Sequence, residues 1–280
     1  MPRAGLLGRS PPRRVAERDR KLRAGSDRPG LGDIPERWRS RTPPRLRVDW
    51  CLDVELVRRW ADRYGDWSTS VTADVPFYVG LARDADGPLA ELAVGNGRVA
   101  IPVAQATGSR VIGIDSSPAM LAQARVRAVE EGVELDLREG DIRELEIEEL
   151  AALIYCPGRS LLHLPTWADR RRCFERVAAS LRSNGRFAWN AFAFDHHVAS
   201  AIDGQHADTP LPHTNYYSVS DNRVDITLDD GGTGSLWWAT KNEWLGLLDV
   251  AGLRLEALYG GFAGEPLDDD SREYIFVARR

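Results

Sequence analysis

The sequence ELAVGNGR, residues 91–98, lies between two apolar stretches and indicates which fold to expect. The apolar stretch Leu89–Val94, which includes the first four of these residues, has the length of a buried strand. The stretch from Arg98 to about Ala106 has a helical pattern. The two glycines permit a tight turn and let a ligand approach the backbone. Asp115 ends the next apolar stretch, 18 residues after Gly97. A carboxylate at that position can accept the hydroxyls of an adenosine ribose, so the pattern predicts a cofactor site at this edge of a sheet.

Strand-like and helical patterns alternate on both sides of this loop. A helical pattern over residues 72–85 precedes it, with Thr72 as the predicted cap. Ser117-Pro118 begins a helix that ends at Gly132, and Thr166 begins one that ends at Asn184-Gly185. The other strands are predicted at residues 110–114, 134–137, 152–156 and 186–193. This alternation predicts an α/β fold, a doubly wound Rossmann-like sheet with helices on both faces.

The pattern changes after Asp195. Residues 214–239 contain β-prone stretches that are separated by Asp221-Asn222 and by the sequence DDGG at 229–232. These features predict a small antiparallel insert. A helix at 242–251 and strands at 253–259 and 273–279 are predicted to end the chain.

Charge is distributed unevenly along the 280 residues. Residues 1–47 have a net charge of +9 and residues 48–280 one of −14, although the whole chain has only −5. The first segment also holds seven of the sixteen prolines and few large apolar residues, so we expect a disordered basic tail. The expected folded domain covers residues 48–280, with a helical cap at 50–87 and the insert at about 195–240.

Composition also restricts the class of protein. No apolar run approaches the length of a membrane span. The three cysteines, Cys51, Cys156 and Cys173, are few, widely spaced and odd in number, which fits a reducing cytoplasm rather than a disulfide framework. The acidic body argues against a nucleic-acid partner, because binding phosphates requires positive charge. We therefore expect a cytoplasmic protein with a small-molecule partner, whose oligomeric state the sequence leaves open.

Two classes of cofactor use a glycine loop in this context. Ala100 can provide the third small residue that a dinucleotide requires, so NAD remains an alternative. Glu91 lies where a carboxylate can hold the polar end of a zwitterionic ligand. Asp141 follows the third predicted strand and can accept the amino group of adenine, while Met120 and Ile142 offer apolar faces for its ring. The more limited alternative is a glycine turn whose nearby acid only caps a helix.

Several motifs in order resemble the class I S-adenosylmethionine-dependent methyltransferases, over about residues 60–280. They are ELAVGNGR, IGIDSSPAML, REGDI, ALIYC and the ending WLGLLDVAGL with REYIFVAR. The resemblance is strongest to methyltransferases of small molecules, and it implies a seven-stranded sheet whose last strand is antiparallel and lies beside the fifth. Two departures are visible: Val94 and Asn96 stand where the family commonly has Cys and Thr, and Ala151-Ala152 stand where the fourth strand often has an acid.

This resemblance implies S-adenosylmethionine as the cofactor and a set of residues that bind it. The glycines face its methionine part, Asp115 takes its ribose, Asp141 and Ile142 bracket its adenine, and Tyr155 and Cys156 end the fourth strand against its methionine moiety. The expected cofactor-binding residues are Tyr64, Glu91, Ala93, Gly95, Gly97, Asp115, Ser116, Met120, Asp141, Ile142, Tyr155 and Cys156.

His163 is the candidate general base. Methyl transfer from a sulfonium needs mainly alignment and exclusion of water, but an amine or hydroxyl acceptor must still lose a proton. His163 follows the fourth predicted strand, where loops line the crevice of such a sheet. Its alternative role is a bond to the backbone in that loop. The segment that begins with Asp195-His196-His197 reads as a solvated polar loop, and its spacing does not favour a metal site.

Aromatic residues before the glycine loop, Tyr64 and Trp67, and in the insert, Tyr216 and Tyr217 among them, suggest walls for an acceptor. The resemblance implies that the N-terminal helices and the insert form a lid over it. Adjacent Trp237 and Trp238 must point in opposite directions on a strand, so only one can face a pocket. The expected substrate residues are Asn190, His196, Tyr217 and Trp238, whereas Trp167, Trp189 and Trp244 are assigned to packing. We therefore expect methyl transfer to a nitrogen or oxygen atom of a small molecule. An NAD(P)-dependent oxidoreductase or a non-catalytic cofactor-binding protein is the alternative.

Overall fold

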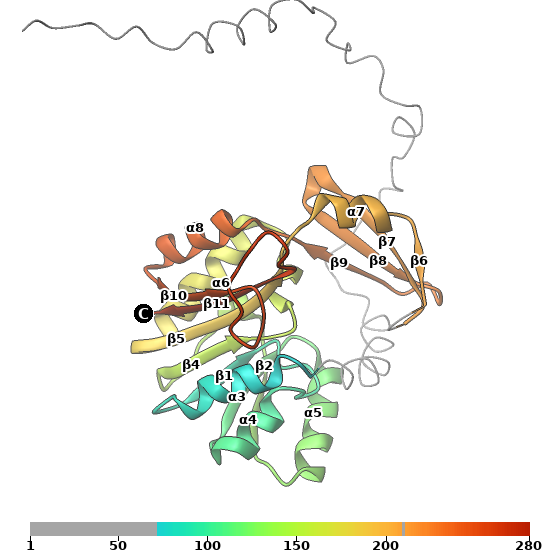
Figure 1. Cartoon of the computed structure of the whole chain (residues 1–280). Helices are drawn as coiled ribbons and strands as arrows, with labels where there is room; N and C mark the ends of the chain where they lie inside the picture. The colour runs from blue at the N-terminus through green and yellow to red at the C-terminus, as the bar shows by residue number, and fades with distance from the viewer. Residues whose placement is uncertain (1–71, 209–210) are drawn as a thin grey trace, which may run out of the picture. The chain divides into compact units, whose positions relative to one another are not determined.

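The centre of the chain is a seven-stranded sheet with the order β10-β11-β5-β4-β1-β2-β3. Strands β1 to β5 run parallel to one another, and β11 lies antiparallel between β10 and β5. This topology confirms the expected doubly wound sheet with an antiparallel last strand beside the fifth (Figure 1). The strands are β1 (Leu89–Leu92), β2 (Val111–Asp115), β3 (Leu135–Glu139), β4 (Ala151–Cys156), β5 (Leu181–Phe192), β10 (Arg254–Tyr259) and β11 (Glu273–Arg279).

This computed structural model describes residues 72–208 and 211–280. Three predictions lie outside these residues: the basic tail at 1–47, the cofactor contact of Tyr64, and all of the helical cap before residue 72. The described end of that cap is helix α3 (Val75–Arg83). Within the described ranges, no helix is long and apolar enough to cross a membrane.

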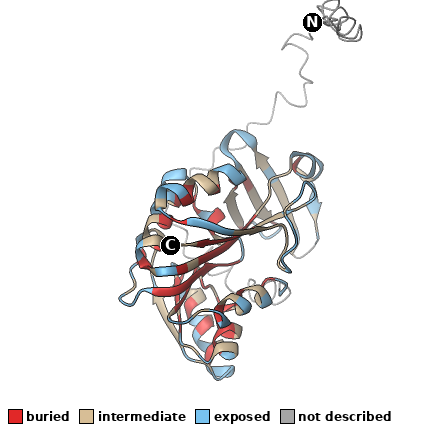
Figure 2. Ribbon diagram, turned by 60° about the vertical axis from the view of Figure 1, so that its left-hand side comes forward, coloured by how far each residue is buried: buried red, intermediate tan, exposed pale blue. Residues whose placement is uncertain are grey.

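Helices cover both faces of the sheet and produce two apolar cores (Figure 1). Residues of β4 alternate between them: Leu153 and Tyr155 pack in the core under α3 and α4, while Ile154 and Cys156 pack in the core under α6 and α8. This alternation is what a sheet buried on both faces requires, and Figure 2 shows its strands mostly buried. The helices are α4 (Ala100–Thr107), α5 (Pro118–Glu130), α6 (Trp167–Ser180) and α8 (Lys241–Ala251).

Aromatic rings dominate the second of these cores. The Trp189 ring stacks on Phe276 with centroids 4.6 Å apart, and Trp244 packs beside both. Trp189 and Trp244 have no exposed surface, so their assignment to packing is confirmed. Trp167 is different, because 43% of it is exposed at the start of α6 and Arg171 lies over its ring. Its assignment to packing was wrong.

Most helix starts follow the local signals in the sequence. The Ser117 hydroxyl accepts from the Met120 backbone N–H at 3.3 Å, and the Thr166 hydroxyl accepts from the Asp169 N–H at 3.0 Å. Both predicted caps are therefore confirmed. Thr72 does not cap α3, which begins at Val75 after Asp74. The Asp74 carboxylate makes no cap hydrogen bond either, because it binds a side chain near the glycine loop instead.

The predicted end of the helix after Thr166 was wrong. Helix α6 ends at Ser180, and β5 already includes Asn184 and Gly185. Asn184 has φ 63°, the left-handed geometry that also occurs where helices end, so the pair Asn-Gly resembles a helix stop. Gly185 is needed for another reason: a Cβ there would lie 2.9 Å from the carbonyl oxygen of Ala151 on β4. The glycine permits this close approach of two backbones.

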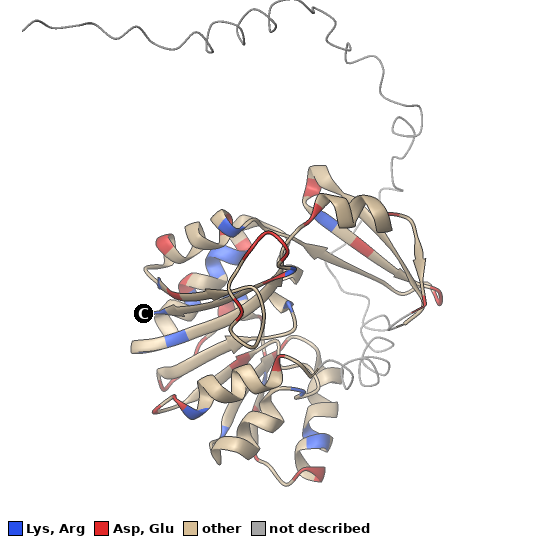
Figure 3. Cartoon of the chain, in the orientation of Figure 1, with Lys and Arg blue, Asp and Glu red and all other residues tan. Residues whose placement is uncertain are grey.

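A second, four-stranded antiparallel sheet with the order β6-β7-β8-β9 confirms the predicted insert. Helix α7 (His196–Ile202) precedes it, and the Asp195 carboxylate caps this helix by accepting from the N–H groups of His197 and Val198. The expectation of a polar loop here was wrong, because this cap lets a short helix form. Acidic and basic residues are spread over both sheets (Figure 3). The strands are β6 (His206–Ala207), β7 (His213–Ser218), β8 (Arg223–Leu228) and β9 (Thr233–Trp237).

Candidate active site

The glycine loop and the end of β2 are joined by hydrogen bonds to one carboxylate. The backbone N–H of Gly95 donates to Asp115 Oδ2 at 2.8 Å, and that of Ser117 donates to Oδ1 at 2.8 Å. Burial raises the pKa of Asp115, and these two hydrogen bonds oppose the rise. The structure therefore brings together two of the predicted cofactor residues and holds the loop in place without a ligand.

The loop itself has the backbone geometry that a close ligand requires. Gly97 has φ +80°, and a Cβ there would lie 3.0 Å from the Ile101 side chain. A larger residue would therefore have both an unfavourable backbone conformation and a close contact with Ile101. Ala93 also has positive φ, 53°, which is uncommon for a residue with a side chain. Both residues were predicted to contact the cofactor, and both lie at the turn between β1 and α4.

Glu91, near the end of β1, has a carboxylate that is almost inaccessible to solvent. It is 2% exposed, and its Oε2 atom has no hydrogen-bond partner among the described residues. The hydroxyl of Tyr155, on neighbouring β4, is likewise buried and unpartnered there. Burial raises the pKa of Glu91 well above its ordinary value, while the charge of Arg98 and the nearby Tyr155 hydroxyl oppose the rise. Glu91 and Tyr155 face each other across β1 and β4, so two buried polar groups lie side by side at this edge of the sheet, and a polar ligand could satisfy both.

Arg98 and Asp74 form a buried ion pair that sequence reasoning missed. The two guanidinium Nη atoms donate to the two carboxylate oxygens at 2.5 and 2.7 Å, a bidentate arrangement. The side chains are only 9% and 3% exposed. The pair fastens the residue after the glycine loop to the start of α3. The only sequence signal was the position of Arg98 at the end of the GNGR motif.

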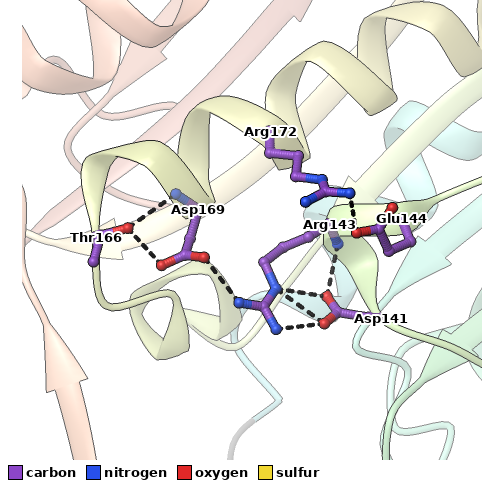
Figure 4. Close-up of polar contacts among 6 residues, drawn as sticks. All are labelled: Asp141, Arg143, Glu144, Thr166, Asp169 and Arg172. Atoms are coloured by element: carbon purple, nitrogen blue, oxygen red, sulfur yellow. Dashed lines mark hydrogen bonds and ion pairs between the residues drawn. The ribbon is translucent and has the colours of Figure 1, made fainter.

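Asp141, the predicted adenine contact, is already bound by an arginine (Figure 4). Arg143 donates from Nε and Nη2 to its carboxylate, at distances of 2.6 to 3.0 Å. Arg143 Nη1 donates to Asp169 at 2.8 Å, and Thr166 in turn contacts Asp169. These hydrogen bonds lower the pKa of Asp141 below its ordinary value. An adenine amino group must therefore share this carboxylate with Arg143.

The other predicted cofactor residues occupy the same edge with different exposure. Ser116 is exposed, whereas Met120 and Ile142 are half-buried and available to an apolar ring. Cys156 has no exposed surface, and its thiol packs in the core under α6. Burial raises the pKa of that thiol well above its ordinary value.

Asn190, a predicted substrate residue, is the centre of a buried hydrogen-bond network. Its Oδ1 atom accepts from the Tyr78 hydroxyl at 3.2 Å and from the Arg159 backbone N–H at 3.3 Å. Its Nδ2 atom donates to Glu273 Oε2 at 3.3 Å. Asn190 is 3% exposed, whereas the side chain of its partner Arg159 is 46% exposed. Sequence reasoning missed both Arg159 and Glu273.

His163 lies at the end of a 3-10 helix, η3 (Ser160–His163), after β4. Its side chain is exposed, although the surrounding protein lowers the pKa of the imidazole from its ordinary value by desolvation. A hydrogen bond to the backbone of Ser235 opposes that shift. Since water still reaches the ring, this desolvation is partial. The structure therefore shows the backbone contact, to Ser235 on β9, and an exposed ring.

Three aromatic residues meet where the insert joins the parallel sheet. Trp238 stacks on Phe194 with centroids 4.1 Å apart, and Tyr217 lies 6.0 Å from Trp238. The predicted substrate residues Tyr217 and Trp238 are thus brought together, although Trp238 is only 4% exposed. His196 is exposed on α7 and packs against the ring of His197. The residues that the structure describes contain no cluster of ligands that fits a metal ion.

A model of a known protein family matches the part of the chain that contains the glycine loop and Asp115. Residues 89–185 match the family model of a methyltransferase domain. No curated protein shows a significant sequence match to the chain.

Solved structures share the fold at low sequence identity. An S-adenosylmethionine-dependent methyltransferase from Clostridium acetobutylicum has a TM-score of 0.67 at 15% identity, covering 80% of this chain and 98% of its own. The CcbJ methyltransferase from Streptomyces caelestis has a TM-score of 0.65 at 22% identity, covering 79% and 95%. CalS10, an amino pentose methyltransferase from Micromonospora echinaspora, has a TM-score of 0.56 at 20% identity, covering 81% and 94%.

The sheet order separates this fold from that of the dinucleotide enzymes. A dinucleotide-binding sheet has the strand order 3-2-1-4-5-6, whereas here an antiparallel strand, β11, lies between the fifth strand and β10. The family match covers β1 to β4, the start of β5, and the segments that hold Asp115 and Asp141. The sheet order and the family match agree: residues 89–185 match a methyltransferase domain, and the fold is the one that solved S-adenosylmethionine-dependent methyltransferases share.

Proposed function

We propose that this enzyme transfers the methyl group of S-adenosylmethionine to a nitrogen or oxygen atom of a small-molecule acceptor. The observation that carries the proposal is the joining of the glycine loop to Asp115, through the 2.8 Å hydrogen bond from Gly95. It presents the loop N–H groups and a carboxylate at the same edge of the sheet, where the carboxyl ends of parallel strands bind ligands.

The unpartnered polar atoms at this edge fit the polar end of the cofactor. S-adenosylmethionine carries an ammonium group, and the Glu91 carboxylate has an unpartnered, buried Oε2 atom to receive it. We assign Asp115 to the ribose hydroxyls and Asp141 to the adenine amino group, with Met120 and Ile142 against the ring. The remaining assignments are Ala93, Gly95, Gly97, Ser116, Tyr155 and Cys156 as cofactor contacts.

The bound cofactor supplies a methyl group that is already activated by a positively charged sulfur. The protein then has to align an acceptor with that methyl group and keep water away. In this proposal the insert that contains β6 to β9 acts as the lid, and Phe194, Tyr217 and Trp238 form an aromatic wall beneath it. Asn190 and His196 complete the predicted acceptor side.

His163 is the proposed general base. Its ring is exposed, and the lowered pKa keeps it unprotonated near neutral pH, the state that accepts a proton. The hydrogen bond to the Ser235 backbone orients the ring while leaving one nitrogen for the acceptor. General-base assistance of this kind typically contributes roughly a hundredfold or more to the rate.

An amine is a reasonable acceptor to try first, because the similar structure CalS10 is described as an amino pentose methyltransferase. Oxygen acceptors belong to the same test. The acidic body and the reduced cysteines support an acceptor other than nucleic acid and a cytoplasmic location.

The experiment has two parts. Titration calorimetry with S-adenosylmethionine and with NADH measures which cofactor binds, and binding of NADH alone would overturn the proposal. A pool of cellular metabolites is then incubated with methyl-labelled cofactor, and label is followed by mass spectrometry. Label on a small molecule, lost in the Asp115→Ala variant, is the expected result. Cofactor binding without any labelled product would favour a non-catalytic protein.

A further inference from the structure

Arg159 lies between β4 and η3 in an uncommon backbone conformation. Its φ is 61°, and among the described non-glycine residues only Ala93, Asn184 and Asn222 share a positive φ. Asparagine tolerates this geometry, whereas alanine and arginine do not favour it. Ala93 belongs to the cofactor loop, so the two unfavourable cases lie at the same, carboxyl edge of the sheet. Strain of this kind is typical of binding sites that the surrounding structure holds in place.

Neighbouring strands hold Arg159 through its backbone and through half of its guanidinium. The backbone N–H donates to Asn190 on β5, and Nε donates to Glu273 Oε1 on β11 at 2.6 Å. Nη2 donates to the same carboxylate oxygen, and the Phe192 ring lies 5.8 Å below the guanidinium carbon. Nη1 has no partner in the described ranges, and the side chain is 46% exposed. Both N–H donors of Nη1 therefore remain unused on a fixed arginine.

Arg143 of the same protein shows that an arginine held by one carboxylate can bind a second one (Figure 4). Its Nε and Nη2 also donate to one carboxylate, that of Asp141, and its Nη1 donates to a second one, that of Asp169, at 2.8 Å. Arg159 has the first carboxylate, Glu273, and lacks the second. A planar guanidinium can bind two anionic groups at once, since its five donors form a rigid fork.

Arg159 lies close enough to Tyr217 of the proposed acceptor wall for its charge to act on that hydroxyl. Burial and the charge of Asp203 raise the pKa of Tyr217 above its ordinary value, and the positive charge of Arg159 opposes that rise. Glu273 begins β11, which is antiparallel, so its start meets the carboxyl ends of β4 and β5. The guanidinium is thus placed between the end of the parallel sheet and the insert.

We propose that Arg159 binds an anionic group of the acceptor, a carboxylate or a phosphate, through Nη1. The acceptor is then a small molecule that carries such a group in addition to the atom that is methylated. Asn190 and Glu273 are positioning residues for Arg159. This inference rests on the proposed function, since it concerns the acceptor side of the same site.

Simple aromatic anions test this assignment before the natural acceptor is identified. The full-length protein, saturated with S-adenosylhomocysteine, is titrated with benzoate and with phenyl phosphate, and with benzamide as the neutral probe of similar shape, using ligand-observed NMR. We expect one of the anions to bind at least tenfold more tightly than benzamide. In Arg159→Gln that preference is lost, because the charge-assisted hydrogen bonds are removed, while benzamide binds as before.

Arg171→Gln is the matched control. Arg171 is also half-exposed, ion-paired with a carboxylate, Glu175, and placed 5.8 Å from an aromatic ring, that of Trp167, but both of these contacts are made within α6. It should leave the preference for anions unchanged. Circular dichroism verifies that each variant is folded.

Two results would overturn the assignment: equal binding of anions and benzamide to the wild-type protein, or an undiminished preference for anions in Arg159→Gln. The identity of the tighter anion separates a carboxylate from a phosphate. Calorimetry with S-adenosylhomocysteine is a separate measurement, and its failure would count against the proposed function. The anion titration on the protein without S-adenosylhomocysteine still tests Arg159 in that case.

Discussion

Replacing Glu91 by Gln separates the effect of this carboxylate on the stability of the fold from its effect on cofactor affinity. The substitution keeps the shape of the side chain and removes its charge. Glu91 is 2% exposed, and burial raises its pKa well above the ordinary 4.5, so the folded protein disfavours the charged form. The same carboxylate has an unpartnered oxygen that is assigned to the cofactor ammonium. We expect Glu91→Gln to stabilise the free protein and to weaken cofactor binding.

The magnitude of the binding effect follows from the kind of interaction that is lost. A hydrogen bond to a charged group contributes about 1.5–3 kcal/mol, which corresponds to a roughly ten- to hundredfold loss of affinity. Wild-type affinity should also rise as the pH rises through the raised pKa of Glu91, because only the deprotonated carboxylate attracts an ammonium group. Glu91→Gln should lack this pH dependence.

The stability effect has the opposite sign. A carboxyl whose pKa is raised in the folded state binds its proton more tightly there than in the unfolded chain. The wild-type protein therefore loses stability as the pH rises from the ordinary pKa of 4.5 toward the raised one. Glu91→Gln removes that loss, and its amide can contact the Tyr155 hydroxyl, so its advantage should grow as the pH rises from 4.5 through the raised pKa of Glu91.

Two measurements check this prediction. Thermal melts of both proteins at a series of pH values report stability, and calorimetry with S-adenosylmethionine at the same pH values reports affinity. Glu175→Gln is the control, because Glu175 is half-exposed and pairs only with Arg171 on the same helix. Unchanged affinity in Glu91→Gln would refute the ammonium assignment, and a lower melting temperature at high pH would refute the argument from burial.

Three further predictions concern other parts of the site and the chain. Asp115→Ala should weaken cofactor binding by roughly 1.5–3 kcal/mol in calorimetry, and it should lower the melting temperature because the N–H groups of Gly95 and Ser117 lose their acceptor. His163→Ala should slow turnover per folded molecule roughly a hundredfold without changing cofactor affinity, and normal turnover would leave it only a structural role. Deleting residues 1–40 should leave cofactor affinity and melting temperature intact, whereas a large fall in either would show that this segment docks.

The sequence by itself determined the features that depend on neighbouring residues. The caps at Ser117 and Thr166 and the glycine turn after β1 are formed by side chains and backbone a few positions apart, so their signals are readable along the chain. The order of strands and helices followed from the same local patterns. The misread end of α6 shows the limit of that approach, because an Asn-Gly pair has the same positive φ in a strand irregularity as at a helix end.

The antiparallel place of β11 came from family resemblance, since apolar periodicity does not encode which strands become neighbours. That pairing brings Glu273 to Arg159, 114 positions away, and the packing of α3 brings Tyr78 to Asn190 on β5, 112 positions away.

Only the tertiary structure decided how charges are buried and paired. The local sequence does not predict the contact of Arg159 with Glu273 or that of Asn190 with Tyr78. It does not predict the Arg98–Asp74 ion pair either. Glu91 reads as an ordinary acid until four surrounding elements exclude water from it. The physical reason is that burial and electrostatic pairing depend on what packs from distant parts of the chain, whereas helix caps and turns do not.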